Sequence, residues 1–471
     1  MKFYNTLTRQ TEDFAPLRDN TARIYSCGPT VYDHIHIGNL SSFIMADTLR
    51  RVLSANGIQT HHVMNFTDVD DKTIARSAER YAGLEPMAAL LKLTGEYSKV
   101  FLDDMAAVGN DTQAINFVKA TENIPAMQAL IKHLHKDGFA YISDDGVYFS
   151  IEAYRKSGKT YGQLTEITAS STSEARIQND EYDKESAHDF ALWKVKKDGE
   201  PAWGFELDGH DLTGRPGWHL ECSVMSSGQL GQPFDLHTGG VDLIFPHHEN
   251  EIAQSTAGQT DPVYAKTFVH NEHLLIDSRK MSKSLNNFFT LEDIREKGFD
   301  PLAFRLLVLQ AHYRKQAHFS WENLEAAQNR LNDLRALAAL RWQPRAVAHD
   351  SGTEALEDVP SELATILSDD LDTPQALAYL SRVTTQLLSV HIEKDMVKHF
   401  EIMLRGLDEL LGLNLLGVDD ITAEQKQLIA RRETARKEQK WDESDRLRDE
   451  LEKQGISLHD HPHGVIWFPW S

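Results

Sequence analysis

The hydrophobic and polar positions near the start of the chain predict a strand, a helix and a second strand. Residues 22–27 (ARIYSC) form a mainly apolar run that a glycine and a proline end. From about Gly38, apolar side chains recur at helical spacing until Gly57, which would stop the helix. The following run, QTHHVMNF at 59–66, has the composition of a strand. This order of elements indicates the beginning of an α/β nucleotide-binding fold.

The middle of the chain continues to alternate between strands and helices. Residues 76–140 are predicted to be helical, and a strand pair is predicted at Tyr141–Phe149. A pattern of strands and helices resumes from about 190 to 310, with FDLHT and FVHNEHLLI as its strands. Between them, residues 166–188 are polar, acidic and rich in Ser and Thr, which is typical of an inserted loop.

The last third of the chain is predicted to be mainly helical. The helical pattern begins at Trp321 and ends near Leu415, and a polar linker interrupts it at 343–360. Residues 422–454 are predicted to form one or two charged helices, and 455–471 a short strand-like tail.

Composition places the chain among ordinary globular proteins. The 471 residues suggest about three domains, and 41% hydrophobic with 25% charged residues exclude a disordered chain or a coiled coil. No apolar run approaches the roughly 18 residues of a membrane span, and the N-terminus lacks a signal pattern. We therefore expect a cytoplasmic protein. Cys27 and Cys222 are the only cysteines, so no disulfide framework is expected.

The net charge of −22 argues against non-specific binding to nucleic acid. A specific RNA partner would need a local basic surface. Residues 426–440 (KQLIARRETARKEQK) carry six basic and two acidic side chains, and a helix with this face could follow a phosphate backbone. From charge alone, a solvated helix with mixed ion pairs is the better interpretation.

Two motifs could bind a polyphosphate. His36, Gly38 and Asn39 belong to a HIGN tetrapeptide at a strand-to-helix junction, where helix N–H groups favour phosphate and glycine permits close approach. An ordinary helix-capping turn is the alternative. Lys280 and Lys283 lie in KMSKS on a loop after an apolar strand, with a solvated basic loop as the alternative. Finding both motifs in one chain is a more specific signal than finding either one alone.

A third set of residues could hold a metal ion. Cys27 follows the first strand, Cys222 lies in GRPGWHLECS, and His247 and Glu251 are four residues apart in PHHENE. If that segment is helical, His247 and Glu251 share a face. Two thiolates, an imidazole and a carboxylate would make a zinc site. Core packing is the alternative for each residue singly, but the two cysteines of the chain both fall in these segments.

The chain resembles class I aminoacyl-tRNA synthetases, whose signatures are HIGH and KMSKS. Asn39 replaces the last histidine and keeps a side-chain donor, so contact with phosphate or ribose is expected to be retained. Over essentially its whole length the chain is similar to the cysteinyl-tRNA synthetase family. The segments that carry the resemblance are SCGPTVYDHIHIGN, NFTDVDDK, DFALWK, GRPGWHLECS, HTGGVDLIFPHHENEIAQS, KMSKSLNNFFT and DDLDTPQAL.

The resemblance implies a fold and a domain order. The expected fold is α/β: a Rossmann-like parallel-sheet catalytic domain split by an insertion, then a helical bundle and a small C-terminal anticodon-binding module. The expected boundaries are 1–114 and 206–320 for the two catalytic halves, 115–205 for the insertion, 321–420 for the bundle and 421–471 for the module. The insertion looks too small and too polar to be an editing domain.

The resemblance also implies roles for individual residues. ATP, accompanied by Mg²⁺ for which we find no distinct ligand set, would be bound by His36, Gly38, Asn39, Asp242, Lys280 and Lys283. His36 and both lysines would be catalytic, with Lys283 and then Lys280 neutralising the departing pyrophosphate. One zinc ion, on Cys27, Cys222, His247 and Glu251, would bind the thiolate of L-cysteine and so favour cysteine over serine.

Weaker candidates surround these residues. Trp218 and His219 are expected to line the substrate pocket, with core packing as the alternative for Trp218. Asp242 could contact the ribose or an ammonium group, or could cap a loop. His237 and His248 are interpreted as structural.

The implied activity is synthesis of Cys-tRNA(Cys) from cysteine, ATP and tRNA by a monomer. One alternative is a cysteine-activating ligase of the mycothiol-pathway type, which does not need an anticodon module. Another is a non-catalytic paralogue that binds tRNA or a nucleotide. The intact KMSKS and the four candidate metal ligands argue against the second alternative.

Overall fold

The structure is a computed structural model that describes residues 1–165, 189–260, 262–276, 279–280, 288–344, 356–388, 392–394, 396–461 and 464–469. The predicted polar insertion at 166–188 and most of the predicted linker at 343–360 lie outside the described residues. Lys283 and most of KMSKS lie outside them as well.

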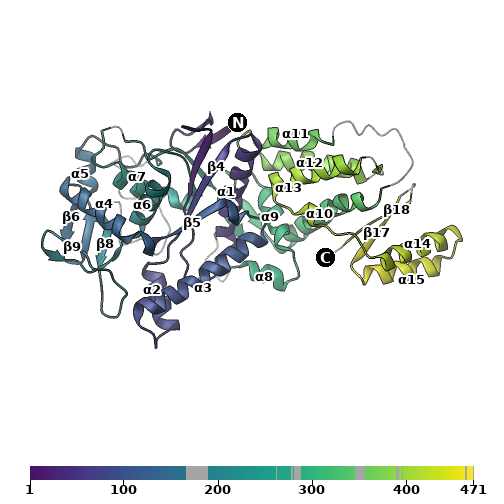
Figure 1. Ribbon diagram of the computed structural model, residues 1–471, viewed down its shortest axis with the longest axis horizontal. Helices are drawn as coiled ribbons and strands as arrows, with labels where there is room; N and C mark the ends of the chain where they lie inside the picture. Colours follow the sequence, from purple (N-terminus) through teal and green to yellow (C-terminus); the bar gives the residue numbers. More distant parts are fainter. Residues whose placement is uncertain are drawn as a thin grey trace.

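A five-stranded parallel sheet forms the centre of the molecule (Figure 1). The strand order is β13-β12-β3-β4-β5. The bounds are β3 Thr21–Ser26, β4 Gln59–Phe66, β5 Ile115–Lys119, β12 Phe234–Gly240 and β13 Ala265–Asn271. β12 is buried along its whole length, as expected of a strand covered on both faces. After β3, the chain adds β4 and β5 on one side of that strand, and it later adds β12 and β13 on the other side. The point where the strand order reverses in this way is where open α/β sheets bind ligands.

The predicted helix after the first strand is α1, Ile37–Ala55, and the predicted strand at 59–66 is β4. Helices α2, Asp71–Arg80, and α3, Pro86–Ala107, follow. The prediction that residues 76–140 are helical is wrong at β5, which pairs with β4 at the edge of the parallel sheet. This strand is only five residues long, and its mixed burial gives too little periodicity to be recognised. The domain boundary at 115 stays a prediction, although β5 belongs to the sheet.

A smaller antiparallel sheet lies at one end of the molecule (Figure 1). The predicted strand pair at Tyr141–Phe149 is confirmed as β6 and β7, which pair in register. The bounds of this part are α4 Ile124–Lys136, β6 Ala140–Ser143, β7 Gly146–Phe149, α5 Ile151–Lys156, β8 Phe190–Val195, β9 Glu206–Leu207, β10 His210–Asp211 and β11 Gly214–Pro216. Helices α6, Trp218–Leu230, and α7, Glu249–Thr256, then lead back to the parallel sheet.

Short elements connect the parallel sheet to the helical part of the chain. β14 pairs with β15 and β16, and helices α8 and α9 lead toward α10. The bounds of these and of the N-terminal hairpin are β1 Lys2–Asn5, β2 Gln10–Asp13, β14 Leu274–Ile276, β15 Arg279–Lys280, α8 Leu291–Glu296, α9 Pro301–Leu309 and β16 Ala317–Phe319.

Helices α10 to α13 form a bundle, and a smaller unit follows it at the far end of the molecule (Figure 1). The bounds are α10 Trp321–Ala339, α11 Asp358–Leu367, α12 Thr373–Leu388, α13 Val397–Leu411, α14 Ala423–Lys437, α15 Trp441–Glu452, β17 Ile456–His461 and β18 Gly464–Pro469. The predicted charged helices and strand-like tail are thereby confirmed. In the described part of the chain, no helix is both long and apolar enough to cross a membrane.

Candidate active site and metal centre

A cavity of about 300 Å³ opens at the carboxyl ends of β3 and β12. It lies where the strand order reverses, so the main chain after both strands contributes to its wall. Predicted site residues from four separate segments line it: Cys27, His36, Asn39, Trp218 and Asp242. Lys72, near the start of α2, lines it too and was not predicted. The signal for Lys72 was available, since it ends the NFTDVDDK segment after the second predicted strand.

The N-terminus of α1 faces this cavity. His36 is the N-cap, and its Nδ1 accepts a hydrogen bond from the backbone N–H of Asn39 at 3.0 Å. Because Nδ1 is the acceptor, a neutral His36 carries its proton on Nε2. Gly38 lies in the same first turn but does not line the cavity. The predicted anion site therefore has a helix N-terminus and two polar side chains at the cavity wall.

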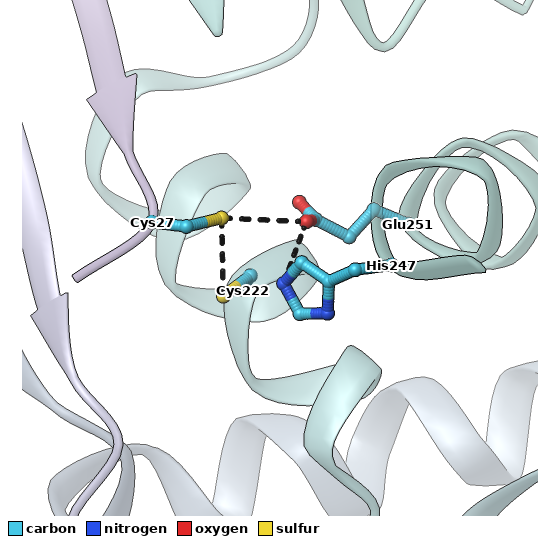
Figure 2. A group of neighbouring side chains, drawn as sticks. All are labelled: Cys27, Cys222, His247 and Glu251. Carbon is cyan, nitrogen blue, oxygen red and sulfur yellow. Dashed lines mark hydrogen bonds and ion pairs between the residues drawn. The ribbon is translucent and has the colours of Figure 1, made fainter. Parts of the chain in front are cut away.

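The four predicted metal ligands lie together (Figure 2), and one of them, Cys27, lines this cavity. The two Sγ atoms are 3.8 Å apart, and Cys27 Sγ is 3.6 Å from Oε1 of Glu251. Nε2 of His247 is 3.0 Å from the same oxygen. One candidate ligand atom from each residue lies within 4.8 Å of all the others, and all four residues are buried.

Local structure explains this convergence. Cys27 directly follows β3, and Cys222 lies on α6. His247 belongs to a short helix, Ile244–His248, that continues into α7, so Glu251 lies one turn further on the same face. Cys27 is the most exposed of the four at 9% and lines the cavity, so the cavity reaches the group through its side chain.

Glu251 and Cys222 are held toward their anionic forms, whereas burial and the neighbouring Cys222 raise the pKa of the Cys27 thiol well above its usual value. Burial raises the pKa of Glu251, but His237 and His247 outweigh it and hold the pKa well below its usual range. Burial lowers the pKa of His247, but the Glu251 carboxylate and Cys222 raise it above its usual value. Burial raises the pKa of Cys222, but the Cys27 thiol and His247 lower it below its usual value. The cluster thus contains carboxylate and thiolate charge that a bound metal could neutralise.

Two histidines interpreted as structural also touch this cluster. His237 Nε2 lies 2.9 Å from Oε2 of Glu251, and His248 Nε2 lies 3.4 Å from Cys27 Sγ. With Cys27 and Glu251 they form a second group that could hold a metal. Sequence reasoning gave them little weight because their spacing did not relate them to the cysteines. The adjacency of His248 to His247 was the available signal.

The remaining predicted residues lie at different distances from the cavity. Trp218 stacks on His247 with a ring distance of 4.2 Å and also lines the cavity. His219 does not line it but is buried behind, with its Nδ1 2.9 Å from Nδ1 of His247. Lys280 lies in β15, where its backbone pairs with Leu275. Lys283 lies outside the described residues.

Solved structures share this fold, and a family model identifies the class. The chain superimposes on methionyl-tRNA synthetase of Mycobacterium tuberculosis with a TM-score of 0.55 and 14% identity, over 86% of this chain and 95% of that one. It also superimposes on a leucyl-tRNA synthetase of Agrobacterium radiobacter K84, solved in a ternary complex. That TM-score is 0.59 and the sequence identity is 12%, over 85% of each chain. Residues 13–329 match the family model described as tRNA synthetases class I (C) catalytic domain. The fold and the matched catalytic domain are those of a class I aminoacyl-tRNA synthetase.

Curated relatives narrow the class to one family. The cysteine–tRNA ligase of Chlamydia muridarum is 39% identical over 98% of both chains, and that of Leptospira interrogans (strain Fiocruz L1-130) is 38% identical over 99% of both. Residues 418–467 match the model of the cysteinyl-tRNA ligase anticodon binding domain. The chain belongs to the cysteine–tRNA ligase family.

Proposed function

We propose that this chain joins L-cysteine to the 3′-terminal ribose of tRNA(Cys), with ATP as co-substrate and one zinc ion per chain. The observation that carries the proposal is geometric. A helix N-terminus suited to phosphate and a buried group of sulfur, nitrogen and oxygen ligands adjoin one cavity. We also propose that the enzyme works as a monomer in the cytoplasm.

The reaction would have two steps. An oxygen of the cysteine carboxylate attacks the α-phosphate of ATP, and pyrophosphate leaves. A terminal ribose hydroxyl of the tRNA then attacks the carbonyl carbon of the adenylate, and AMP leaves. Neither step needs a nucleophile from the protein, so the chain would contribute orientation and charge stabilisation. His36 and Asn39 would orient the phosphates, and Lys280 and Lys283 would neutralise the departing pyrophosphate.

The donor set fits zinc. Two sulfur atoms, an imidazole nitrogen and a carboxylate oxygen are ligands that this ion takes in proteins. Nε2 of His247 is a buried nitrogen without an aligned hydrogen bond among the described residues, although Glu251 is near, and it could become a ligand by losing its proton when a metal binds. Cys27, Cys222, His247 and Glu251 would hold the ion, which, when bound, would lower the pKa of a substrate thiol and retain the thiolate.

This arrangement would favour cysteine over serine. The two amino acids differ by one atom, so the shape of the cavity discriminates weakly between them. A site built for one polar group rejects analogues lacking it by roughly 10⁴-fold or more. The cavity reaches the sulfur cluster at Cys27, which gives a side chain entering from the nucleotide side access to the ligands.

The substitution Cys222→Ser tests the zinc proposal. We expect it to abolish both bound zinc and cysteine-dependent pyrophosphate exchange, because it removes one of two soft ligands. Elemental analysis and the exchange assay measure the two effects. Ser227→Ala on the same helix is the control and should change neither. A metal-free Cys222→Ser protein with full exchange activity would contradict the zinc proposal.

Transfer of labelled cysteine to tRNA distinguishes the possible activities. Transfer supports the proposal. Adenylate formation without transfer would favour the cysteine-activating ligase, which the match to an anticodon binding domain does not favour. Neither reaction would favour a non-catalytic paralogue.

Lys283→Ala tests the assignment of the pyrophosphate contact. We expect a fall of about 10²-fold or more in the rate of adenylate formation, since the variant lacks one preorganised group that stabilises developing charge. Equilibrium binding of cysteine should change little, because Lys283 is assigned to the phosphates. Single-turnover kinetics measure the first quantity and calorimetry the second. An unchanged rate would remove Lys283 from this role.

A further inference from the structure

The two carboxylate oxygens of Glu251 face different partners. Oε1 is turned toward the predicted metal ligands, at 3.0 Å from His247 Nε2 and 3.6 Å from Cys27 Sγ. Oε2 accepts a hydrogen bond from the hydroxyl of Tyr264 at 2.7 Å and lies 2.9 Å from His237 Nε2. Since an ionised carboxylate only accepts, Nε2 of His237 must be the donor. Both donors to Oε2 are absent from the predicted ligand set.

Tyr264 is itself held firmly. It is 2% exposed, and its ring packs edge-on against Phe234 at 5.1 Å. Its hydroxyl is also 2.6 Å from Ser226 Oγ on α6. Tyr264 precedes β13 and His237 lies on β12, so two other parts of the chain fix the orientation of a carboxylate on α7.

We propose that Tyr264, together with His237, is a positioning residue that limits Glu251 to one metal-facing oxygen and so keeps a coordination position for the cysteine thiolate. This inference rests on the zinc site of the proposed function. Catalytic zinc sites are usually four-coordinate and sometimes expand to five ligands. Four protein atoms and the substrate sulfur already make five. A second oxygen from Glu251 would therefore compete with the substrate sulfur.

Tyr264→Phe is the direct test, because it removes the hydroxyl and keeps the buried ring. We expect zinc to stay at the parent level while the dissociation constant for cysteine rises about tenfold, the lower range for changes to groups that orient metal ligands. Zinc X-ray absorption of the cysteine-free variant should show more oxygen or nitrogen neighbours than the parent. Elemental analysis, calorimetry without ATP and the absorption spectrum provide the three readouts.

Two control variants isolate the contact. Tyr154→Phe also removes a buried tyrosine hydroxyl bonded to α7, but that hydroxyl meets Thr256 at 2.8 Å instead of Glu251. Ser226→Ala removes the other partner of the Tyr264 hydroxyl and leaves its bond to Glu251. Both variants should keep zinc and bind cysteine within about twofold of the parent.

Three results would overturn the proposal. Tyr264→Phe could bind cysteine as the parent does, which would show that the hydroxyl sets no coordination position. It could lose zinc, which would make Tyr264 necessary for metal retention instead. A parent spectrum with one sulfur neighbour would place the metal in the second ligand group, where His237 would be a ligand.

Failure of the underlying zinc proposal would look different. In that case the parent protein itself would contain no zinc, or would bind cysteine equally well after chelation. The parent and the Tyr264→Phe variant are therefore measured side by side, so that the first comparison tests the zinc site and the second tests the role of Tyr264.

Discussion

His247 is held by a different kind of contact on each side. Trp218 stacks on its ring at 4.2 Å, and its Nδ1 lies 2.9 Å from Nδ1 of His219. Its Nε2 faces Glu251 at 3.0 Å. These neighbours fix the direction of the one imidazole in the predicted ligand set. Ligating histidines usually depend on such outer contacts for their orientation.

Trp218 is therefore expected to act at both the cavity and the metal ligands. Trp218→Leu should raise the KM for cysteine in pyrophosphate exchange about tenfold, because the variant lacks the ring that orients His247 and closes the cavity wall. Zinc content should stay at the parent level. Trp342→Leu, a partly exposed residue after the long helix α10, is the control. A parent-like KM in Trp218→Leu would show that the stacking has no part in substrate binding.

At the scale of elements, a buried charge cluster joins α1 to the helical bundle. Asp47 on α1 meets Arg305 of α9 at 2.7 Å, and both side chains are fully buried. Arg51 of α1 contacts Asp47 and donates to the carbonyls of Asp408 and Glu409 on α13. The helix that faces the cavity at its N-terminus is thus tied to the bundle further along its length.

Asp47→Asn should lower the free energy of unfolding by about 3 to 5 kcal/mol at pH 7, because the guanidinium of Arg305 stays buried without its counter-charge. Urea unfolding measures this decrease. Asp111→Asn is a matched control: Asp111 also pairs with an arginine, Arg50, but its side chain is 44% exposed. The control should change stability by about 1 kcal/mol or less. Equal decreases in both variants would contradict the assigned importance of burial.

Asp47 also predicts how the free energy of unfolding depends on pH. Burial raises the pKa of Asp47, but Arg305, Arg51 and Arg50 outweigh it and hold the pKa well below its usual range. A carboxyl with a depressed folded-state pKa contributes stability that is present above its unfolded pKa, about 3.9, and is lost as pH falls below it. Below pH 4, the free energy of unfolding of Asp47→Asn should therefore fall less steeply with decreasing pH than that of the parent. The two slopes should differ by up to about 1.4 kcal/mol per pH unit. Parallel slopes down to pH 3 would contradict this assignment.

At the scale of the whole molecule, the central parallel sheet, at whose edge the cavity opens, and the C-terminal unit of α14, α15, β17 and β18 lie apart along the long axis of the ribbon (Figure 1). Arg432 of α14 is buried, and its two terminal guanidinium nitrogens donate to the two carboxylate oxygens of Asp460 on β17, at 2.7 and 2.8 Å. Arg431 and Lys437 on the same helix are exposed. Part of the basic sequence at 426–440 therefore holds the unit together, and part of it lies at the surface, where Arg431 makes only a long ion-pair contact of 4.0 Å with Glu443.

Reversing the two exposed charges tests this division. Arg431→Glu with Lys437→Glu should raise the KM for tRNA, and the slope of log affinity against log salt should fall by about one for each phosphate that the variant no longer binds. Pyrophosphate exchange, which needs no tRNA, should not change. Arg155→Glu with Lys156→Glu on α5, at the other end of the molecule, reverses the same number of exposed charges and is the control for net charge. Equal effects of this control would point to overall charge instead of a local surface.

The sequence predicted residues whose chemistry is distinctive and whose motif is local. Cys27 and Cys222 stood out because the chain has no other cysteine, and His247 and Glu251 because their spacing fits one helix face. It missed β5, a short edge strand whose pairing with β4 depends on a partner distant in sequence. It also gave Tyr264 no role, since nothing near this residue in the chain relates it to Glu251.

What the sequence determined by itself is the family, the order of elements and the candidate ligands, because these depend on residue type and local periodicity. Tertiary structure alone decided which carboxylate oxygen faces the cysteines, which histidines contact them, and that the nucleotide and metal regions adjoin one cavity. Those properties depend on distances of a few ångströms between elements far apart in the chain. Packing sets such distances, and no local pattern records them.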